Sequence, residues 1–215
     1  MLRSLKQLYG EQLSATDGEI GTIKDFYFDE ENCAIRYLVV NTGNWLASRK
    51  VLISPHSIPS HPASGKSIRV SLTRKKIEKS PSIGPQNPVL REYEEQHHKH
   101  YRLPPYWKAS AADMVGPQQQ PKTHLHSALS VTGYLVRVGD ETIGHVSDFM
   151  VNTENWNIGQ LVVKTGHRLS GTDTLLLPKQ VERISYDEST VFAYPIMDVP
   201  QQTPAKKLVP AGTIL

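Results

Sequence analysis

Two stretches of the chain carry the same pattern of apolar and polar positions. Apolar side chains recur at about every second residue in both, which is the period of a half-buried β-strand. Each stretch leads through a short polar reversal into a second apolar run and then into further short strands. The predicted strands are residues 22–28, 35–40, 51–53 and 67–72 in the first half, and residues 143–151, 158–163, 175–177 and 190–194 in the second half.

The two halves are copies related by a constant offset of 123 residues. Residues 20–26 match residues 143–149 without a gap, and 15 of the 39 positions from 20 to 58 are identical to those 123 residues later. Unrelated segments of ordinary composition would share about two or three. The repeated positions that we expect to be structural are Gly21, Asp25, Gly43 and Pro55 in the first copy, and Gly144, Asp148, Gly166 and Pro178 in the second.

The repeat decides the expected architecture. Five or six short strands with tight turns in about 75 residues suit a small closed or nearly closed β-barrel. We therefore predict a mainly β protein with two small β-barrels in tandem. The first barrel is assigned to residues 1–81 and the second to 127–204, with a linker at 82–126 and a tail at 205–215.

The linker is expected to contain one α-helix near residues 89–102. Pro88 suits a first helical turn, acidic side chains lie toward the N-terminal end, and Lys99 and Arg102 lie toward the C-terminal end. Leu103 and two prolines then stop the helix.

Composition changes this picture little. The formal net charge of +3 is too small to indicate a nucleic-acid partner by itself, and the single Cys33 cannot form an internal disulfide. We find no secretory signal pattern and no apolar run of the roughly 18 residues that cross a bilayer. A soluble protein in a reducing cytoplasm is the expectation, and a place against the inner face of a membrane stays open.

Two sets of polar residues are candidates for catalysis or metal binding. Asp25 and Asp148 occupy equivalent positions, and we expect each carboxylate to accept backbone N–H groups rather than to catalyse, because neither has a paired acid at fixed spacing. His97, His98 and His100, with His124 and His126 further on, are the best metal candidates, but a solvated helix surface is the preferred interpretation. The sequence contains no catalytic triad pattern or phosphate-binding glycine loop, so no enzyme, metal or cofactor site is predicted.

Aromatic and basic residues outside the predicted cores are the candidates for partner contact. Tyr and Trp are enriched at the centres of protein interfaces, although a linker helix could instead pack them against a barrel. The candidate partner surface consists of Trp45, Tyr93, Tyr101, Tyr106 and Trp107. A short basic run, Arg74, Lys75, Lys76 and Lys79, is either a solvated barrel end or a contact for RNA.

The sequence resembles the PRC-barrel family. The resemblance is carried by residues 18–29 (GEIGTIKDFYFD), by residues 38–40 (LVV), by Trp45 and Leu46, and by residues 51–55 (VLISP), and it extends over roughly 4–81 and 127–204. The second copy departs from it at Arg168, where the first has Trp45. This family is named for the cytoplasmic domain of the photosynthetic reaction centre H subunit and includes a domain of a ribosome-maturation factor.

The resemblance implies a function in protein contact rather than catalysis. We expect a non-enzymatic interaction or scaffolding module, associated with a reaction centre or another electron-transfer complex at the cytoplasmic face of the membrane. The alternative that the resemblance offers is a protein that binds the ribosome or RNA. Neither the partner nor the oligomeric state can be predicted.

Overall fold

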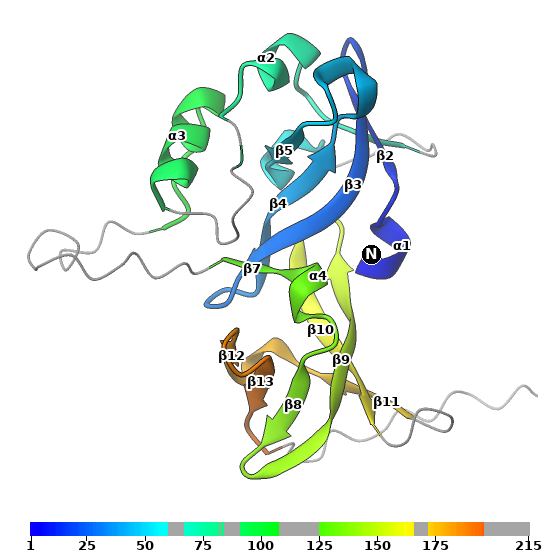
Figure 1. Cartoon of the computed structure of the whole chain (residues 1–215), viewed down its shortest axis with the longest axis vertical. Helices are drawn as coiled ribbons and strands as arrows, with labels where there is room; N and C mark the ends of the chain where they lie inside the picture. Colours follow the sequence, from blue (N-terminus) through cyan, green and yellow to red (C-terminus); the bar gives the residue numbers. More distant parts are fainter. Residues whose placement is uncertain (60–66, 82, 84–90, 108–124, 166–171, 196–215) are drawn as a thin grey trace, which may run out of the picture.

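The protein is mainly β and divides visibly into two halves (Figure 1). The computed structural model describes residues 1–59, 67–81, 83, 91–107, 125–165 and 172–195. The first half of the sequence forms the upper part of the molecule in Figure 1, and the second half forms the lower part.

The elements follow one another in nearly the same order in each half. In the first half they are β1 (Leu2–Ser4), α1 (Leu5–Leu8), β2 (Gln12–Ala15), β3 (Gly18–Asp29), β4 (Ala34–Asn41), η1 (Gly43–Leu46), β5 (Lys50–Ile53), η2 (Pro55–Ser57), β6 (Ser67–Arg69), α2 (Arg74–Glu78) and α3 (Arg91–Tyr101). In the second half they are β7 (Leu125–Ser127), α4 (Ala128–Val131), β8 (Leu135–Val138), β9 (Glu141–Asn152), β10 (Asn157–Thr165), β11 (Thr172–Leu176), η4 (Pro178–Gln180), β12 (Val181–Ser185) and β13 (Thr190–Ala193).

The predicted repeat is present as a structural repeat. The short strands β1 and β7, the single helical turns α1 and α4, and the long strands β3 and β9 start 123 residues apart. In both copies the long strand passes very close to its neighbour at the repeated glycine. A Cβ atom added to Gly21 would lie 1.9 Å from the carbonyl oxygen of Asn41, and one added to Gly144 would lie 2.3 Å from that of Lys164. Only glycine allows this approach, which explains why it recurs.

The two copies join at the turn between their long strands. Ile35 N–H donates to the carbonyl of Trp156, and Ile158 N–H donates to that of Cys33, both at 2.8 Å. These bonds are mutual equivalents, since 35 and 158 and also 33 and 156 are 123 apart. They flank the Ala34–Asn157 pair, where β4 meets β10, and we call this junction the seam. The copies are therefore related by an approximate two-fold axis at this pair.

Each copy also lends its first strand to the other. The strand β1 pairs with β9 of the second copy, and β7 pairs with β3 of the first, with Arg3 opposite Val151 and His126 opposite Phe28. Figure 1 shows α1 and α4, which continue these strands, near the middle of the molecule. We call β1–α1 and β7–α4 the exchanged arms.

This exchange changes the expected pair of separate barrels. Residues 125 and 126, assigned to the linker, belong to an exchanged arm, and α2 forms where no helix was predicted. The strands of the described residues form one sheet, and one cluster of buried apolar residues runs from Leu5 to Ala193 through both copies. The exchanged arms and the contact between β4 and β10 give each half hydrogen-bonded backbone partners in the other half, so the two halves share their core.

Candidate interaction surfaces

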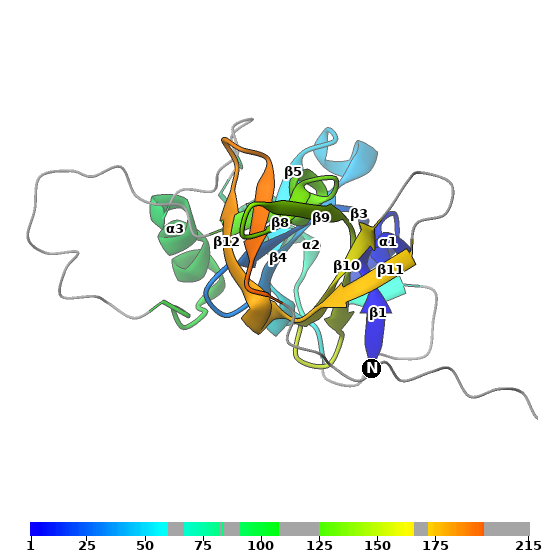
Figure 2. The ribbon, with the colours of Figure 1, turned by 90° about the horizontal axis from the view of Figure 1, so that it is seen from below.

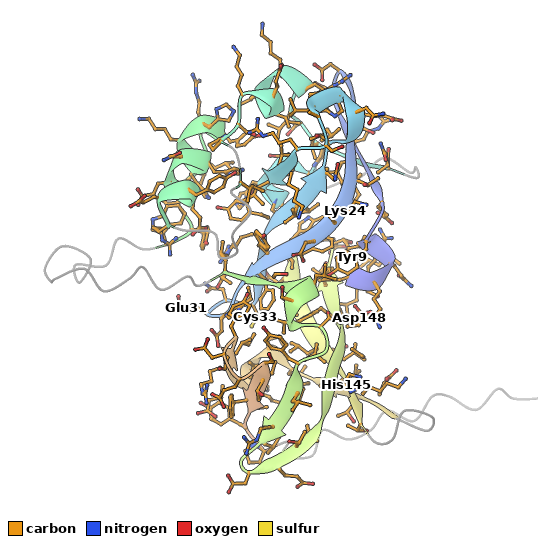
Figure 3. The ribbon with its side chains drawn as sticks, viewed as in Figure 1. Tyr9, Lys24, Glu31, Cys33, His145 and Asp148 are labelled. Atoms are coloured by element: carbon orange, nitrogen blue, oxygen red, sulfur yellow. The ribbon has the colours of Figure 1, made fainter. Side chains whose placement is uncertain are left out.

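The two repeated aspartates hold the exchanged arms. Asp25 accepts hydrogen bonds from the hydroxyl of Ser127 at 2.6 Å and from the N–H of Leu129 at 3.0 Å. Asp148 accepts the equivalent bonds from the hydroxyl of Ser4 and from the N–H of Lys6. Figure 3 places Asp148 near the middle of the molecule, where the halves meet. Each aspartate thus fastens the first helical turn of the other copy, with the geometry of a helix cap.

The two aspartates differ in burial. Asp25 is 9% exposed, and burial raises the pKa of its carboxyl group, although the hydrogen bonds from Ser127, Leu129 and Phe26 work in the opposite direction. Its partners are hydrogen-bond donors held by secondary structure, and no second carboxylate bonds to it among the described residues. Asp25 therefore accepts backbone N–H groups, as expected from the sequence.

The helix α3 covers the outer face of β3, β4 and β5. A second, smaller apolar cluster lies beneath it, made of Tyr27, Tyr37, Val39, Leu52 and Leu125, with Ile83, Tyr93 and Tyr106 packed against it. Three of the candidate partner residues are engaged within the molecule, on α3 or directly after it. Tyr101 is buried, the hydroxyl of Tyr93 donates to the carbonyl of Pro81, and the hydroxyl of Tyr106 donates to Glu94 at 2.5 Å.

The expected solvated histidine surface is wrong for two of the three helix histidines. His97 has no exposed surface and His98 is 8% exposed. His97 Nε2 lies 3.0 Å from the carbonyl oxygen of Leu52, and burial lowers the pKa of His97 to about 4. His98 contacts Pro104 and the hydroxyl of Tyr37. The same helix face carries Glu94, so α3 docks through polar side chains that hydropathy assigns to water.

A polar pocket lies where α3 and the first copy meet the seam. Its volume is about 330 Å³, and it is bordered by Arg36, His56, His98, Tyr106, Glu154, Asn155 and Asn157 among others. The charge of Arg36, which borders this pocket, is already neutralised, because Arg36 Nε lies 2.5 Å from the buried Asp29 carboxylate. The Arg36 guanidinium also stacks 4.0 Å from the centre of the Tyr106 ring. The pocket therefore offers hydrogen-bond partners rather than a free charge.

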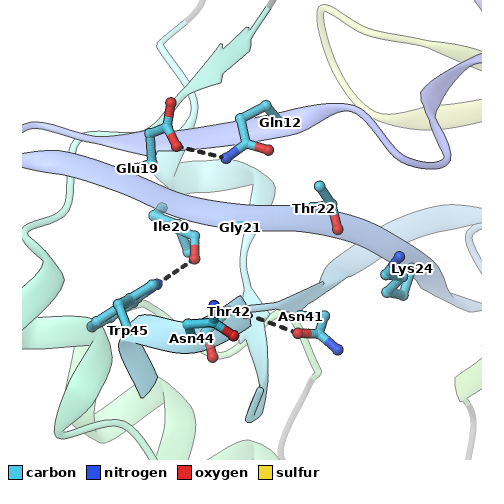
Figure 4. A pocket seen from close by; sticks show the side chains of 11 residues that line it. Gln12, Glu19, Ile20, Gly21, Thr22, Lys24, Asn41, Thr42, Asn44 and Trp45 are labelled. Carbon is cyan, nitrogen blue, oxygen red and sulfur yellow. Dashed lines mark hydrogen bonds between the residues drawn. The ribbon is translucent and has the colours of Figure 1, made fainter. Parts of the chain in front are cut away.

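Trp45 lies at an open hollow on the first copy (Figure 4). The hollow has a volume of about 430 Å³ and is lined by polar side chains of β2, β3 and β4 together with Gly21 and Gly43. The indole N–H of Trp45 donates to the carbonyl of Ile20 at 2.5 Å, and the Arg74 guanidinium stacks 4.3 Å from its ring. Trp45 is thus the candidate partner residue that borders this hollow, whereas Trp107 lies beside His98 and under Arg91.

The remaining candidates are distributed over the molecule without forming a site. Arg74 and Lys76 of the basic run contact the rings of Trp45 and Tyr101. His126 is buried 3.0 Å from Glu30, whereas His124 and Gly166 lie outside the described residues. Within the described ranges, no three His, Cys, Asp or Glu side chains converge as metal ligands. None of the helices there is both long and apolar enough to traverse a bilayer.

Sequence reasoning missed the groups that bind the two copies together. Ser4 and Ser127, like Leu2 and Leu125, are identical residues 123 apart, so extending the repeat toward the N-terminus would have found them. Nothing in the sequence showed that each serine would bond the aspartate of the other copy.

These features define a duplicated, mainly β protein whose repeated residues hold its two copies together and whose first copy carries an open hollow beside Trp45. Residues 4–75 match the PRC-barrel domain family, as the sequence predicted. The chain thus contains a PRC-barrel domain in its first half, which indicates a protein-interaction module in general. A comparison with curated proteins found no match.

Proposed function

We propose that this protein is a non-enzymatic scaffold that binds other proteins, and that its two copies act as tandem PRC-type barrels fused at a two-fold seam. The match at residues 4–75 supports the first barrel, and the 123-residue repeat with its equivalent hydrogen bonds supports the second.

The observation that supports this proposal is that the repeated residues hold the two copies together. Gly21 and Gly144 allow strands to approach, and Asp25 and Asp148 fasten the arms. A duplicated catalyst would be expected to repeat a set of reactive groups around an open cavity. Here the repeated groups support a rigid frame, which is what a scaffold needs in order to hold partners at a fixed spacing.

The finer proposal concerns the partner. Family resemblance supports a location at the cytoplasmic face of the inner membrane, beside a photosynthetic reaction centre or another electron-transfer complex. Ribosome or RNA binding through Arg74, Lys75, Lys76 and Lys79 remains the alternative, although the Arg74 guanidinium stacks on Trp45 and the Lys76 amine lies 5.7 Å from the centre of the Tyr101 ring.

Crosslinking in cells that make the protein naturally, followed by mass spectrometry, tests the proposal. We expect one or a few protein partners, in the membrane fraction if the finer proposal holds. Sedimentation with ribosomes at low salt would support the alternative instead. A monomeric protein that crosslinks to nothing would contradict the scaffold function.

A further inference from the structure

The face that α3 covers on the first copy has an exact counterpart on the second, 123 residues further along the repeat. The first face consists of Leu125, Tyr27, Tyr37, Val39 and Leu52. The equivalent residues are Leu2, Met150, Gln160, Val162 and Leu175, which we call the second outer face. Strand register agrees, because Val162 pairs with Leu175 as Val39 pairs with Leu52.

The second outer face points away from the core. Its neighbours along the same strands, Leu161, Val163 and Leu176, are buried in the shared core. Side chains alternate across a strand, so Val162 and Leu175 lie on the opposite side. Figures 1 and 2 both show β11, which carries Leu175, on the side of the molecule opposite α3.

The two equivalent faces differ sharply in exposure. Under α3, Leu52 is 0% exposed and Leu125 is 3% exposed. Their counterparts Leu175 and Leu2 are 50% and 49% exposed in the part of the chain that the structure describes. Two half-exposed leucines beside a half-buried valine and methionine form an apolar surface of the kind that marks an interaction site.

We propose that the second outer face is the seat for an amphipathic helix of a partner protein. The proposal rests on the scaffold function above and adds where the partner binds. The choice of a helix follows from the molecule itself, since α3 lies on the equivalent face, which is formed by β3, β4, β5 and β7. Apolar side chains at i, i+3 and i+4 of the partner would contact Leu2, Val162 and Leu175.

The chemistry of the seat also distinguishes the partner helix from α3. Tyr37 binds the buried Glu94 and His98 of α3, but its counterpart is Gln160. A helix on the second outer face therefore needs no buried carboxylate or histidine. A hydroxyl or amide side chain opposite Gln160 would satisfy this position, because an unpaired amide buried at an interface is costly.

Site-specific photocrosslinking of the full chain tests the seat. A benzophenone amino acid replaces Leu175 in one variant and Leu135 in a matched control, since Leu135 on β8 is similarly exposed at 48%. The protein is expressed in its own cells and irradiated, and the crosslinked segment of the partner is identified by mass spectrometry. A synthetic peptide of that segment is then titrated into the purified full chain.

The expected result is a crosslink at position 175 to an amphipathic segment whose peptide gains helical circular dichroism on binding. Leu175→Glu should weaken binding at least about tenfold and Leu175→Ala by less, while Leu135→Glu should leave it within about twofold. Unchanged thermal unfolding of Leu175→Glu excludes misfolding as the cause.

The seat would be overturned by a crosslink at position 175 to a second copy of this chain or to residues 196–215 of the same chain. A partner segment bound as a strand along β11, or a peptide that binds Leu175→Glu as well as wild type, would also overturn it. A partner captured at position 135 but not at 175 would refute the seat and leave the scaffold function intact. Capture at neither position would count against both.

Discussion

Acidification should weaken the docking of α3 through a single buried histidine. His97 has no exposed surface, and its Nδ1 atom has no hydrogen-bond partner among the described residues. Its Nε2 atom faces the carbonyl oxygen of Leu52 and must donate there, so in the neutral ring Nε2 carries the proton and Nδ1 carries none. A proton added to Nδ1 would place a charge in an apolar layer between α3 and β5.

The magnitude follows from the two pKa values. Burial lowers the pKa of His97 in the folded protein to about 4, from an ordinary value of 6.5. As the pH falls, the unfolded chain binds the proton first, so the stability present above pH 6.5 is lost between there and pH 4. At about 1.4 kcal/mol per pKa unit, the loss is about 2 kcal/mol at pH 5 and approaches about 3 kcal/mol at pH 4.

Urea unfolding of wild type and His97→Gln from pH 7.5 to 5 measures this effect. The glutamine amide can still donate to Leu52 but does not titrate. Glu94 and Asp25 have raised pKa values through burial and act in the opposite direction, yet they remain in both proteins, as do His98 and His100. The difference between the two profiles therefore isolates His97, and His56→Gln, at an exposed histidine, controls for the loss of one imidazole.

The wild type should lose about 2 kcal/mol more than His97→Gln over this pH range. Profiles that stay parallel within about 0.5 kcal/mol would refute the reasoning, because His97 would then be protonated equally easily in both states.

Three further predictions concern the frame. Gly21→Ala should destabilise the protein by about 3 kcal/mol or more in urea unfolding, because the added Cβ would collide with the backbone of Asn41. Gly43 also has a positive φ but has open space around it, so Gly43→Ala should cost about 1 kcal/mol. Equal losses would show that backbone strain, and not the close contact, explains the glycine at position 21. Ser127→Ala should lower the free energy of unfolding by about 1–3 kcal/mol, more than Ser4→Ala, because it removes a hydrogen-bond donor from Asp25, the more buried aspartate. The reverse order would contradict the role given to Asp25. A protease site inserted between residues 108 and 124 should yield two fragments that still co-elute in size-exclusion chromatography, since β1 lies on β9 and β7 on β3; separation without denaturant would argue against the exchanged arms.

The strands and the repeat were predictable because they are local and periodic. Alternation places Phe26 and Phe28 inward, and the offset of 123 residues carries the same prediction to Phe149 and Val151. The linker helix was predictable for the same reason, and α3 lies within the predicted range.

The exchange and the buried helix face were not predictable from these patterns. A three-residue strand such as β1 is too short to show a period, and its pairing with β9 instead of β3 is set by contacts between residues far apart in the sequence. On α3 the buried positions are Glu94, His97, His98 and Tyr101, which follow the helical spacing but are mostly polar. Hydropathy assigns such residues to solvent, whereas hydrogen bonds to Tyr37 and Leu52 of the facing sheet and to Pro104 and Tyr106 beyond the helix offset the cost of their burial.

Fusion of the two copies into one chain explains how the faces came to differ. In a symmetric dimer of identical subunits, any substitution appears on both faces at once, so both would be covered or both open. Here Tyr37 and Gln160 occupy equivalent positions, and only the first has the hydroxyl that binds Glu94 and His98 of α3. Because Glu94 and His98 of α3 would lose that hydroxyl partner on the second face, α3 fits the first face alone. The second copy keeps the apolar half of the same surface exposed, and a scaffold requires only that one of its faces be free.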